Sequence, residues 1–251
     1  MFGGKKNPEE ISRKFLEDVN AIWPERDSSV ILYGSAARGD FRPGRSDVNF
    51  LVVVEDLSPE KLRRTQSRTK DWRRERVATP LFLRRKLIQT SLDSYPLEFL
   101  SMMASYRVLQ GEDALADLKI SSDDVRLQCE REVKSKLLLL REAYVESGGS
   151  RHVMRDIVAQ SLPAMTAIFQ GLLYLQGKPW KLWRDELLTA GQEAFQLDAE
   201  LFRELWKVKR QEVRPGADRM HEIMGRYLVE MERLADWADR GGLKHEERTG
   251  G

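Results

Sequence analysis

The chain reads Leu32-Tyr33-Gly34-Ser35-Ala36-Ala37-Arg38-Gly39-Asp40 and, after four intervening residues, Arg45-Ser46-Asp47-Val48-Asn49-Phe50-Leu51-Val52-Val53. The apolar, β-prone residues 30–33 and 48–54 predict two short buried strands. Glycine lets the backbone approach a ligand closely, and the first amides of a helix favour a phosphate. We therefore predict a strand, then a phosphate-binding turn into a helix after Ser35, and then a second strand.

The second predicted strand opens with two polar side chains, Asp47 and Asn49. Alternate residues of a strand share a face, so both side chains are expected to point toward the same phosphate. Mg²⁺ binds through a few protein oxygens together with substrate phosphates. The spacing therefore indicates a metal-assisted phosphate site.

This arrangement resembles the signature of the DNA polymerase β-like nucleotidyltransferase superfamily, which is Gly-Ser, a short helix and an Asp-x-Asp pair opening a strand. Gly34-Ser35 and Ser46-Asp47 stand at the expected separation, and Ala37-Arg38-Gly39 is typical of the small bacterial members. The resemblance covers roughly residues 8–110. The helical half resembles, more loosely, the C-terminal bundle of aminoglycoside nucleotidyltransferases such as the kanamycin enzyme.

The resemblance implies metal-dependent transfer of a nucleotidyl group, AMP, from ATP or another nucleoside triphosphate to an unidentified acceptor. It implies that Mg²⁺ or Mn²⁺ is held by Asp47, Asn49 and Glu98, with Asp47 and Glu98 as the catalytic residues. The residues that it implies for nucleotide binding are Gly34, Ser35, Arg38 and Ser46, and Arg45 joins Arg38 in neutralising pyrophosphate.

The resemblance implies a third carboxylate on a later strand, and Glu98 is its best candidate because it follows Pro96 and stands among the apolar residues Leu97, Phe99 and Leu100. We predict a third strand over residues 97–103 on this basis. The alternatives to Glu98 stand in less strand-like surroundings; they are Asp93, Glu112 and Asp113.

The chain departs from the superfamily pattern at Asn49, where the second carboxylate of the pair is expected. An amide oxygen can ligate Mg²⁺ but brings no charge, and two-metal sites rely on anionic ligands. Two interpretations follow. The protein is an enzyme with an altered or slower site, or it is a catalytically weak or inactive fold that binds nucleotide or a partner.

Predicted strands cluster before residue ~110 and helices follow it, which predicts an α+β fold. We expect a small mixed-sheet nucleotidyltransferase domain over 1–115, a helical bundle over 116–240 and a disordered tail over 241–251. Helical patterns cover residues 8–22, 59–76, 80–95, 123–146, 151–176, 182–194, 198–210 and 217–238.

The composition argues against a disulfide-stabilised protein and against a membrane-spanning one. Among 251 residues there is one cysteine, Cys129, which excludes an internal disulfide framework. The longest uninterrupted apolar run is Phe50–Val54, and no signal peptide is visible, so we expect a cytoplasmic protein without a membrane span.

The helical half is expected to supply the acceptor site or a homodimer contact, since it often does so in the enzymes that the chain resembles.

Formal net charge is +2, but residues 61–86 carry eleven Lys or Arg against two acids. Such a segment attracts phosphates or nucleic acid, and it is also typical of a solvated helix face. Both interpretations stay open at this stage.

Overall fold

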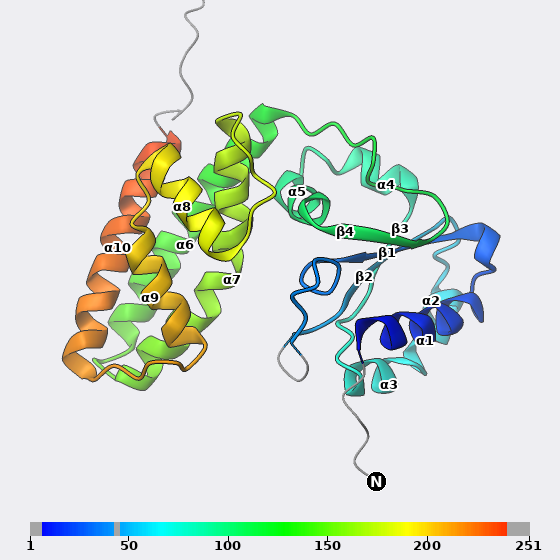
Figure 1. Cartoon of the computed structure of the whole chain (residues 1–251), viewed down its shortest axis with the longest axis horizontal. Helices are drawn as coiled ribbons and strands as arrows, with labels where there is room; N and C mark the ends of the chain where they lie inside the picture. Colours follow the sequence, from blue (N-terminus) through cyan, green and yellow to red (C-terminus); the bar gives the residue numbers. More distant parts are fainter. Residues whose placement is uncertain (1–6, 43–45, 240–251) are drawn as a thin grey trace, which may run out of the picture. The chain divides into compact units, whose positions relative to one another are not determined.

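The computed structural model describes residues 7–42 and 46–239, which form two compact units (Figure 1). The first unit extends to Asp93 and takes in Ser101–Lys119, and the second contains Ser94–Leu100 and the chain from Ile120 onward. The predicted α+β fold is confirmed, because a small mixed sheet is followed by helices. Arg45 and the predicted tail over 241–251 lie outside the described residues.

A four-stranded sheet forms the centre of the first unit, in the order β3-β2-β1-β4. Its strands are β1 (Ser28–Tyr33), β2 (Asn49–Val54), β3 (Leu81–Leu83) and β4 (Tyr106–Gln110). β1 pairs antiparallel with both β2 and β4, and β2 pairs parallel with β3. The two predicted central strands are therefore neighbours, and the turn after β1 lies at the same end of the sheet as the start of β2.

Helix α1 (Pro8–Asn20) covers one face of this sheet, because its apolar residues recur at helical spacing. The Asn7 side chain caps it by accepting from the Glu10 amide. Phe15 stacks on Phe50 of β2 with ring centroids 4.0 Å apart. The Trp72 indole donates to the buried Asp18 carboxylate at 2.9 Å, which ties α1 to α3.

The connecting segments of this unit differ in part from the sequence predictions. The helix predicted over 59–76 is two helices, α2 (Pro59–Gln66) and α3 (Thr69–Arg74), and the 80–95 stretch is β3 followed by α4 (Arg85–Thr90). The strand predicted over 97–103 is wrong, because that segment is helix α5 (Pro96–Ala104). Pro96 stands at its first position, where proline suits a helix start.

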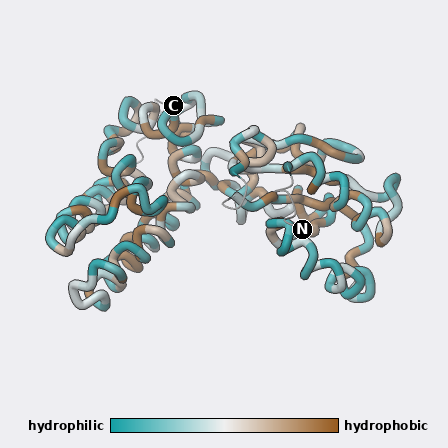
Figure 2. Tube along the Cα trace, turned by 60° about the horizontal axis from the view of Figure 1, so that its bottom comes forward, coloured by the Kyte–Doolittle hydropathy of each residue, from teal (hydrophilic) through white to brown (hydrophobic). Residues whose placement is uncertain are grey.

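In its described residues the second unit contains, beyond the start of α5, the helices α6 (Ser122–Glu146), α7 (Arg151–Leu175), α8 (Arg184–Phe195), α9 (Ala199–Lys209) and α10 (Ala217–Asp239). They confirm the helices predicted for this half. Hydrophilic and hydrophobic residues alternate along them, as expected for helices with one buried face (Figure 2). Phe169 of α7 meets Phe202 of α9 edge to face, with ring centroids 4.9 Å apart.

Pro163 lies inside α7 and changes how that helix is bonded. Proline has no N–H, so the carbonyl of residue 159, four positions earlier, lacks its helical donor. The Lys209 ammonium, from the end of α9, donates to the Ala159 carbonyl at 2.9 Å. Burial lowers the pKa of Lys209. The hydrogen-bond donor that Pro163 removes from α7 is thus replaced by a side chain at the end of α9.

Helix α7 is the one described helix whose length and composition would suit a membrane span. Half of its most apolar window is buried within the fold, and its buried residues include Met154, Val158 and Leu162. The expectation of a chain without a membrane span rested on uninterrupted apolar runs alone, and it stays a prediction. The burial is that of a core helix of the bundle.

Candidate functional site

The turn after β1 supplies backbone donors. Gly34 has a positive φ of 78°, and its N–H donates to the Ser105 carbonyl at 2.9 Å. The predicted helix is absent here, since residues 34–39 form turns. Nevertheless, the amides of residues 35, 36 and 37 have no hydrogen-bond acceptor in the described part of the chain. Consecutive unbonded amides of this kind suit an anion.

Gly34 also lies directly against Asn49. A β-carbon at position 34 would stand 3.3 Å from Asn49 Nδ2, tighter than ordinary contact. Because φ is positive as well, glycine is favoured at this position on two counts. The structure therefore brings Gly34 of the turn and Asn49 together, and the joint role of Asp47 and Asn49 at this turn stays a prediction.

Asp47 precedes β2 and is exposed, with 54% of its side chain accessible. Its Oδ1 atom forms an ion pair with Arg76 Nη2 at 3.0 Å. Backbone bonds hold the two residues together, because the Arg76 carbonyl accepts from the Val48 amide at 2.9 Å. Arg76 was not singled out from the sequence, since it is one cation among the eleven of residues 61–86.

Two tyrosines lie beside Asn49 on the same face of the sheet. Tyr33 is directly opposite Asn49 in β2 and opposite Tyr106 in β4. Burial raises the pKa of Tyr33. Burial and a 2.9 Å hydrogen bond to Asp113 raise the pKa of Tyr106 to about 12. Both phenols therefore stay protonated at neutral pH.

The other predicted nucleotide-binding residues have local partners. Arg38 Nε donates to Asp40 Oδ2 at 2.6 Å. Ser46 Oγ accepts from the Arg42 amide at 3.0 Å, and the Ser46 amide donates to the Arg42 carbonyl. These bonds shape the link between β1 and β2, and a role for either residue in nucleotide binding stays a prediction.

Glu98 lies on helix α5, within the second unit. Its Oε2 atom accepts from Gln128 Nε2 at 2.9 Å, and Gln128 Oε1 also accepts from the Leu97 amide. Leu97 packs so closely on α7 that a β-carbon at Gly171 would meet it at 2.4 Å. The strand environment predicted for Glu98 is thus replaced by a helix start, and its role as third metal ligand stays a prediction.

Few acidic side chains near Asp47 could serve as metal ligands. None of the four described strands contains an aspartate or glutamate. Among residues 7–42 and 46–239, no group of three or more His, Cys, Asp or Glu side chains is placed to hold a metal ion. Of the predicted alternatives, Asp113 bonds Tyr106 and Glu112 pairs with Arg85 at 2.7 Å.

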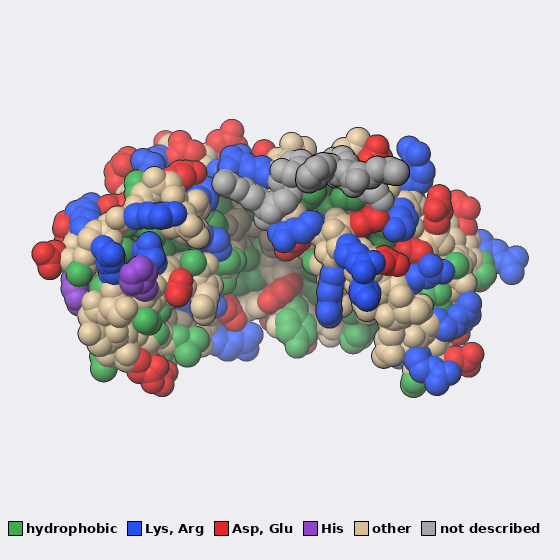
Figure 3. All heavy atoms as spheres, turned by 90° about the horizontal axis from the view of Figure 1, so that it is seen from below, with side chains coloured by type: hydrophobic (Ala, Val, Ile, Leu, Met, Phe, Trp, Pro, Cys, Tyr) green, Lys and Arg blue, Asp and Glu red, His purple; other side chains and the backbone are tan. Residues whose placement is uncertain are grey.

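Some cations of the basic segment over 61–86 bond to other parts of the fold, and others face solvent. Lys61 and Arg64 donate to the carbonyls of Ile22 and Ala21, just beyond the end of α1, and Arg68 pairs with Asp18. On the face drawn in Figure 3, basic side chains are interspersed with acidic ones. Several of the cations therefore fasten α2 and α3 to α1, and nucleic-acid binding through this segment stays a prediction.

Known proteins share the segment that contains this site. Residues 12–97 match the nucleotidyltransferase domain family. The matched segment includes Gly34, Ser35, Asp47 and Asn49, and it ends one residue before Glu98. The match supports the resemblance to the polymerase β-like superfamily and nucleotidyl transfer in general. The resemblance of the helical half to aminoglycoside enzymes stays a prediction.

A curated relative adds to this match. The chain is 40% identical over 48 residues to a protein of Methanocaldococcus jannaschii named "Putative protein adenylyltransferase". The aligned part is 19% of this chain and 48% of that protein, so the chain spans about half of the relative's length. The similarity therefore supports nucleotidyl transfer in general, and it covers only a part of each protein.

Arg76 is expected to compete with a cation for Asp47. Replacing Arg76 with Gln removes the counter-charge, so Mn²⁺ should bind up to about fivefold more tightly, since an exposed ion pair contributes about 1 kcal/mol or less. The measurement is a Mn²⁺ titration followed by electron paramagnetic resonance, with a non-hydrolysable ATP analogue present. The control Arg76→Lys retains the charge and should bind Mn²⁺ like the wild type. Weaker Mn²⁺ binding by Arg76→Gln would contradict the competition.

Proposed function

We propose that this protein transfers AMP from ATP to an acceptor, using the site around Asp47. The observation that carries the proposal is the contact between Gly34 and Asn49, which joins a turn of unbonded amides to the strand that follows Asp47. The match of residues 12–97 to the nucleotidyltransferase domain supports it.

Phosphate binding is assigned to the backbone of the turn. The amides of residues 35–37 would donate to the β- and γ-phosphates, as consecutive backbone donors do in anion-binding turns. The Gly34 amide is already bonded to Ser105, so it holds the turn in place. The protonated phenol of Tyr33, next to Asn49, is a further donor on this face.

The donor set fits one divalent cation that arrives with the nucleotide. Asp47 offers an exposed carboxylate and Asn49 an amide oxygen, and Mg²⁺ commonly takes one or two protein ligands plus substrate phosphates and water. When bound, the cation would neutralise phosphate charge as a Lewis acid. A second cation fits poorly, because Asn49 is neutral and the described strands carry no further acid.

The reaction we propose is an in-line displacement at phosphorus. The acceptor oxygen forms a bond to the α-phosphorus while the bond to the bridging oxygen of pyrophosphate breaks. The acceptor proton passes to a general base, and Glu98 stays the residue that the sequence predicts for that role. The name of the relative from M. jannaschii favours a protein as the acceptor. A hydroxyl side chain of a protein, this chain included, is therefore the first acceptor to test.

A second candidate function is nucleotide binding without turnover. Two observations favour it: Asn49 stands where the resembling enzymes have a carboxylate, and Arg76 already neutralises Asp47. Such a protein would retain the phosphate-binding turn and lose the charge that holds the metal.

Labelled ATP separates the two functions. The protein is incubated with Mg²⁺ and with ATP carrying the label in either the α- or the γ-phosphate, and calorimetry measures nucleotide binding in parallel. Nucleotidyl transfer predicts label on protein from α-labelled ATP and none from γ-labelled ATP. Binding without transfer of either label supports the second function. Transfer of the γ-label would contradict both, because it is phosphoryl transfer.

A further inference from the structure

The helical unit contains a charged cleft between α9, the loop over 210–216 and α10. Its volume is about 580 Å³, within the range of pockets that bind small molecules. Nine residues line it, and two of them are acidic, Glu200 and Glu204. Five are cationic, namely Arg203, Lys207, Arg214, Arg219 and Arg226. The lining therefore carries five cations against two acids, and acids just outside it pair with several of the arginines.

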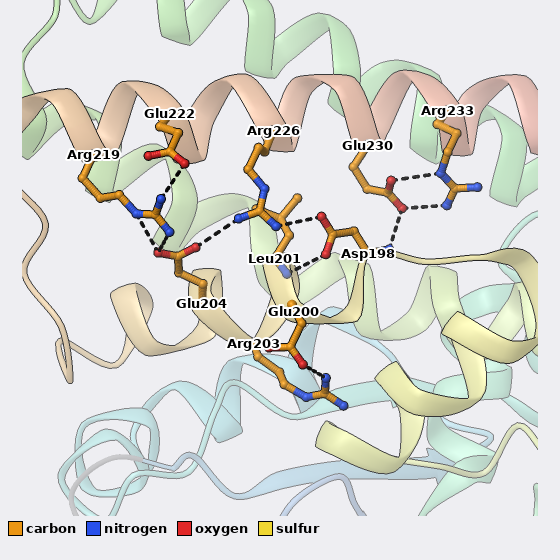
Figure 4. Close-up of polar contacts among 10 residues, drawn as sticks. All are labelled: Asp198, Glu200, Leu201, Arg203, Glu204, Arg219, Glu222, Arg226, Glu230 and Arg233. Atoms are coloured by element: carbon orange, nitrogen blue, oxygen red, sulfur yellow. Dashed lines mark hydrogen bonds and ion pairs between the residues drawn. The ribbon is translucent and has the colours of Figure 1, made fainter.

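Ion pairs hold the arginines of the cleft in fixed orientations. Arg219 contacts Glu204 and Glu222, each at 2.6 Å. Arg226 donates to Asp198 at 2.8 Å and approaches the other oxygen of Glu204 at 3.4 Å. Figure 4 shows this chain of contacts running between α9 and α10. Guanidinium groups held in this way lose little side-chain entropy when they bind a further anion.

Two cations of the cleft have no such partner. The side chains of Lys207 and Arg214 make no hydrogen bond or ion pair with any residue in the described part of the chain. Lys207 also lies one helical turn from Arg203 on α9, and Arg203 is paired with Asp185 and Glu200. A bound anion would give Lys207 and Arg214 the partners that they lack in the described part of the chain, and would stabilise the folded unit.

We propose that this cleft binds a small phosphate-bearing molecule with two or more negative charges. Arginine forks match the geometry of phosphate oxygens, and Lys207 adds a point charge. Val213 and Pro215 provide an apolar wall for the remainder of the ligand. The cleft lies wholly within the helical unit and shares no residue with the site around Asp47, so this proposal does not depend on nucleotidyl transfer.

Inorganic pyrophosphate is the probe, titrated by calorimetry into the full chain at constant ionic strength. EDTA removes divalent cations, and the cleft variants Lys207→Ala and Arg214→Ala distinguish binding in the cleft from binding at the turn after β1. We expect saturable binding that Lys207→Ala and Arg214→Ala each weaken about tenfold, the loss of one charge-assisted contact. Neither variant breaks an ion pair, and circular dichroism verifies that each is folded. The matched control is Arg131→Ala, an exposed cation of α6 outside the cleft, which should bind normally.

Three results would overturn the proposal. The first is no saturable binding of pyrophosphate. The second is an equal loss of affinity in Arg131→Ala and Arg214→Ala, which would indicate attraction to overall charge. The third is tighter binding of either citrate or a short single-stranded oligonucleotide than of pyrophosphate. Citrate would indicate a carboxylate ligand, and the oligonucleotide would indicate nucleic acid.

Discussion

Asp47→Ala is expected to lose nucleotidyl transfer from α-labelled ATP by at least about a hundredfold. Asp47 stands two residues before Asn49, which lies against Gly34 of the phosphate-binding turn, and a cation held there would contribute several kcal/mol to the transition state. The labelling rate at saturating Mg²⁺ measures the effect. The loss should appear in the rate more than in folding, because the Asp47 side chain is exposed.

Asp27→Ala is the matched control for this prediction. Asp27 is also an exposed aspartate of the first unit with an arginine neighbour, Arg26, but it lies in the short helix before β1. Its removal should leave labelling unchanged. Labelling that survives in Asp47→Ala would contradict the assignment of Asp47, whatever the acceptor.

Asn49→Asp is expected to strengthen Mn²⁺ binding by up to about a hundredfold. The change replaces a neutral contact with a charge-assisted one, worth about 1–3 kcal/mol. Titration of Mn²⁺ in the presence of ATP measures it. Asn7→Asp makes the same chemical change at the cap of α1, where aspartate also caps a helix, and should not alter metal binding. Weaker or unchanged Mn²⁺ binding by Asn49→Asp would contradict a cation at this position.

The two variants together distinguish an active enzyme from a decayed one. Wild-type transfer lost only in Asp47→Ala supports an enzyme that uses Asn49 as it stands. Transfer that appears only in Asn49→Asp indicates a decayed site on an intact fold. Absence of metal-dependent ATP binding in the wild type and in both variants refutes the nucleotide site itself.

The sequence was sufficient for the parts of the fold that local patterns determine. The apolar runs at 30–33 and 48–54 predicted β1 and β2, and helical spacing predicted the helices beyond residue 120. The contact of Gly34 with Asn49 followed from the same segment. These features depend on residues close together in the chain, so the pattern carries the information.

Other features depend on partners far away in the chain. The segment 97–103 was assigned to a strand because a short apolar run fits a strand or a helix equally well. β3 has only three residues, and its parallel pairing with β2 is what makes it a strand. Arg76 meets Asp47 only because Val48 pairs with the backbone around residue 77. No local pattern distinguishes Arg76 from the other cations of its segment.

Pro163 of α7 and Lys209 of α9 depend on each other, because both determine which donor the Ala159 carbonyl has. A residue with an N–H at 163 would give the Ala159 carbonyl a second donor, whereas loss of the ammonium at 209 with the proline retained would leave that carbonyl with none. Substitutions at the two positions are therefore coupled rather than additive. A variant bundle assembled by exchanging α9 with that of another protein must carry a donor at this position, or exchange α7 as well.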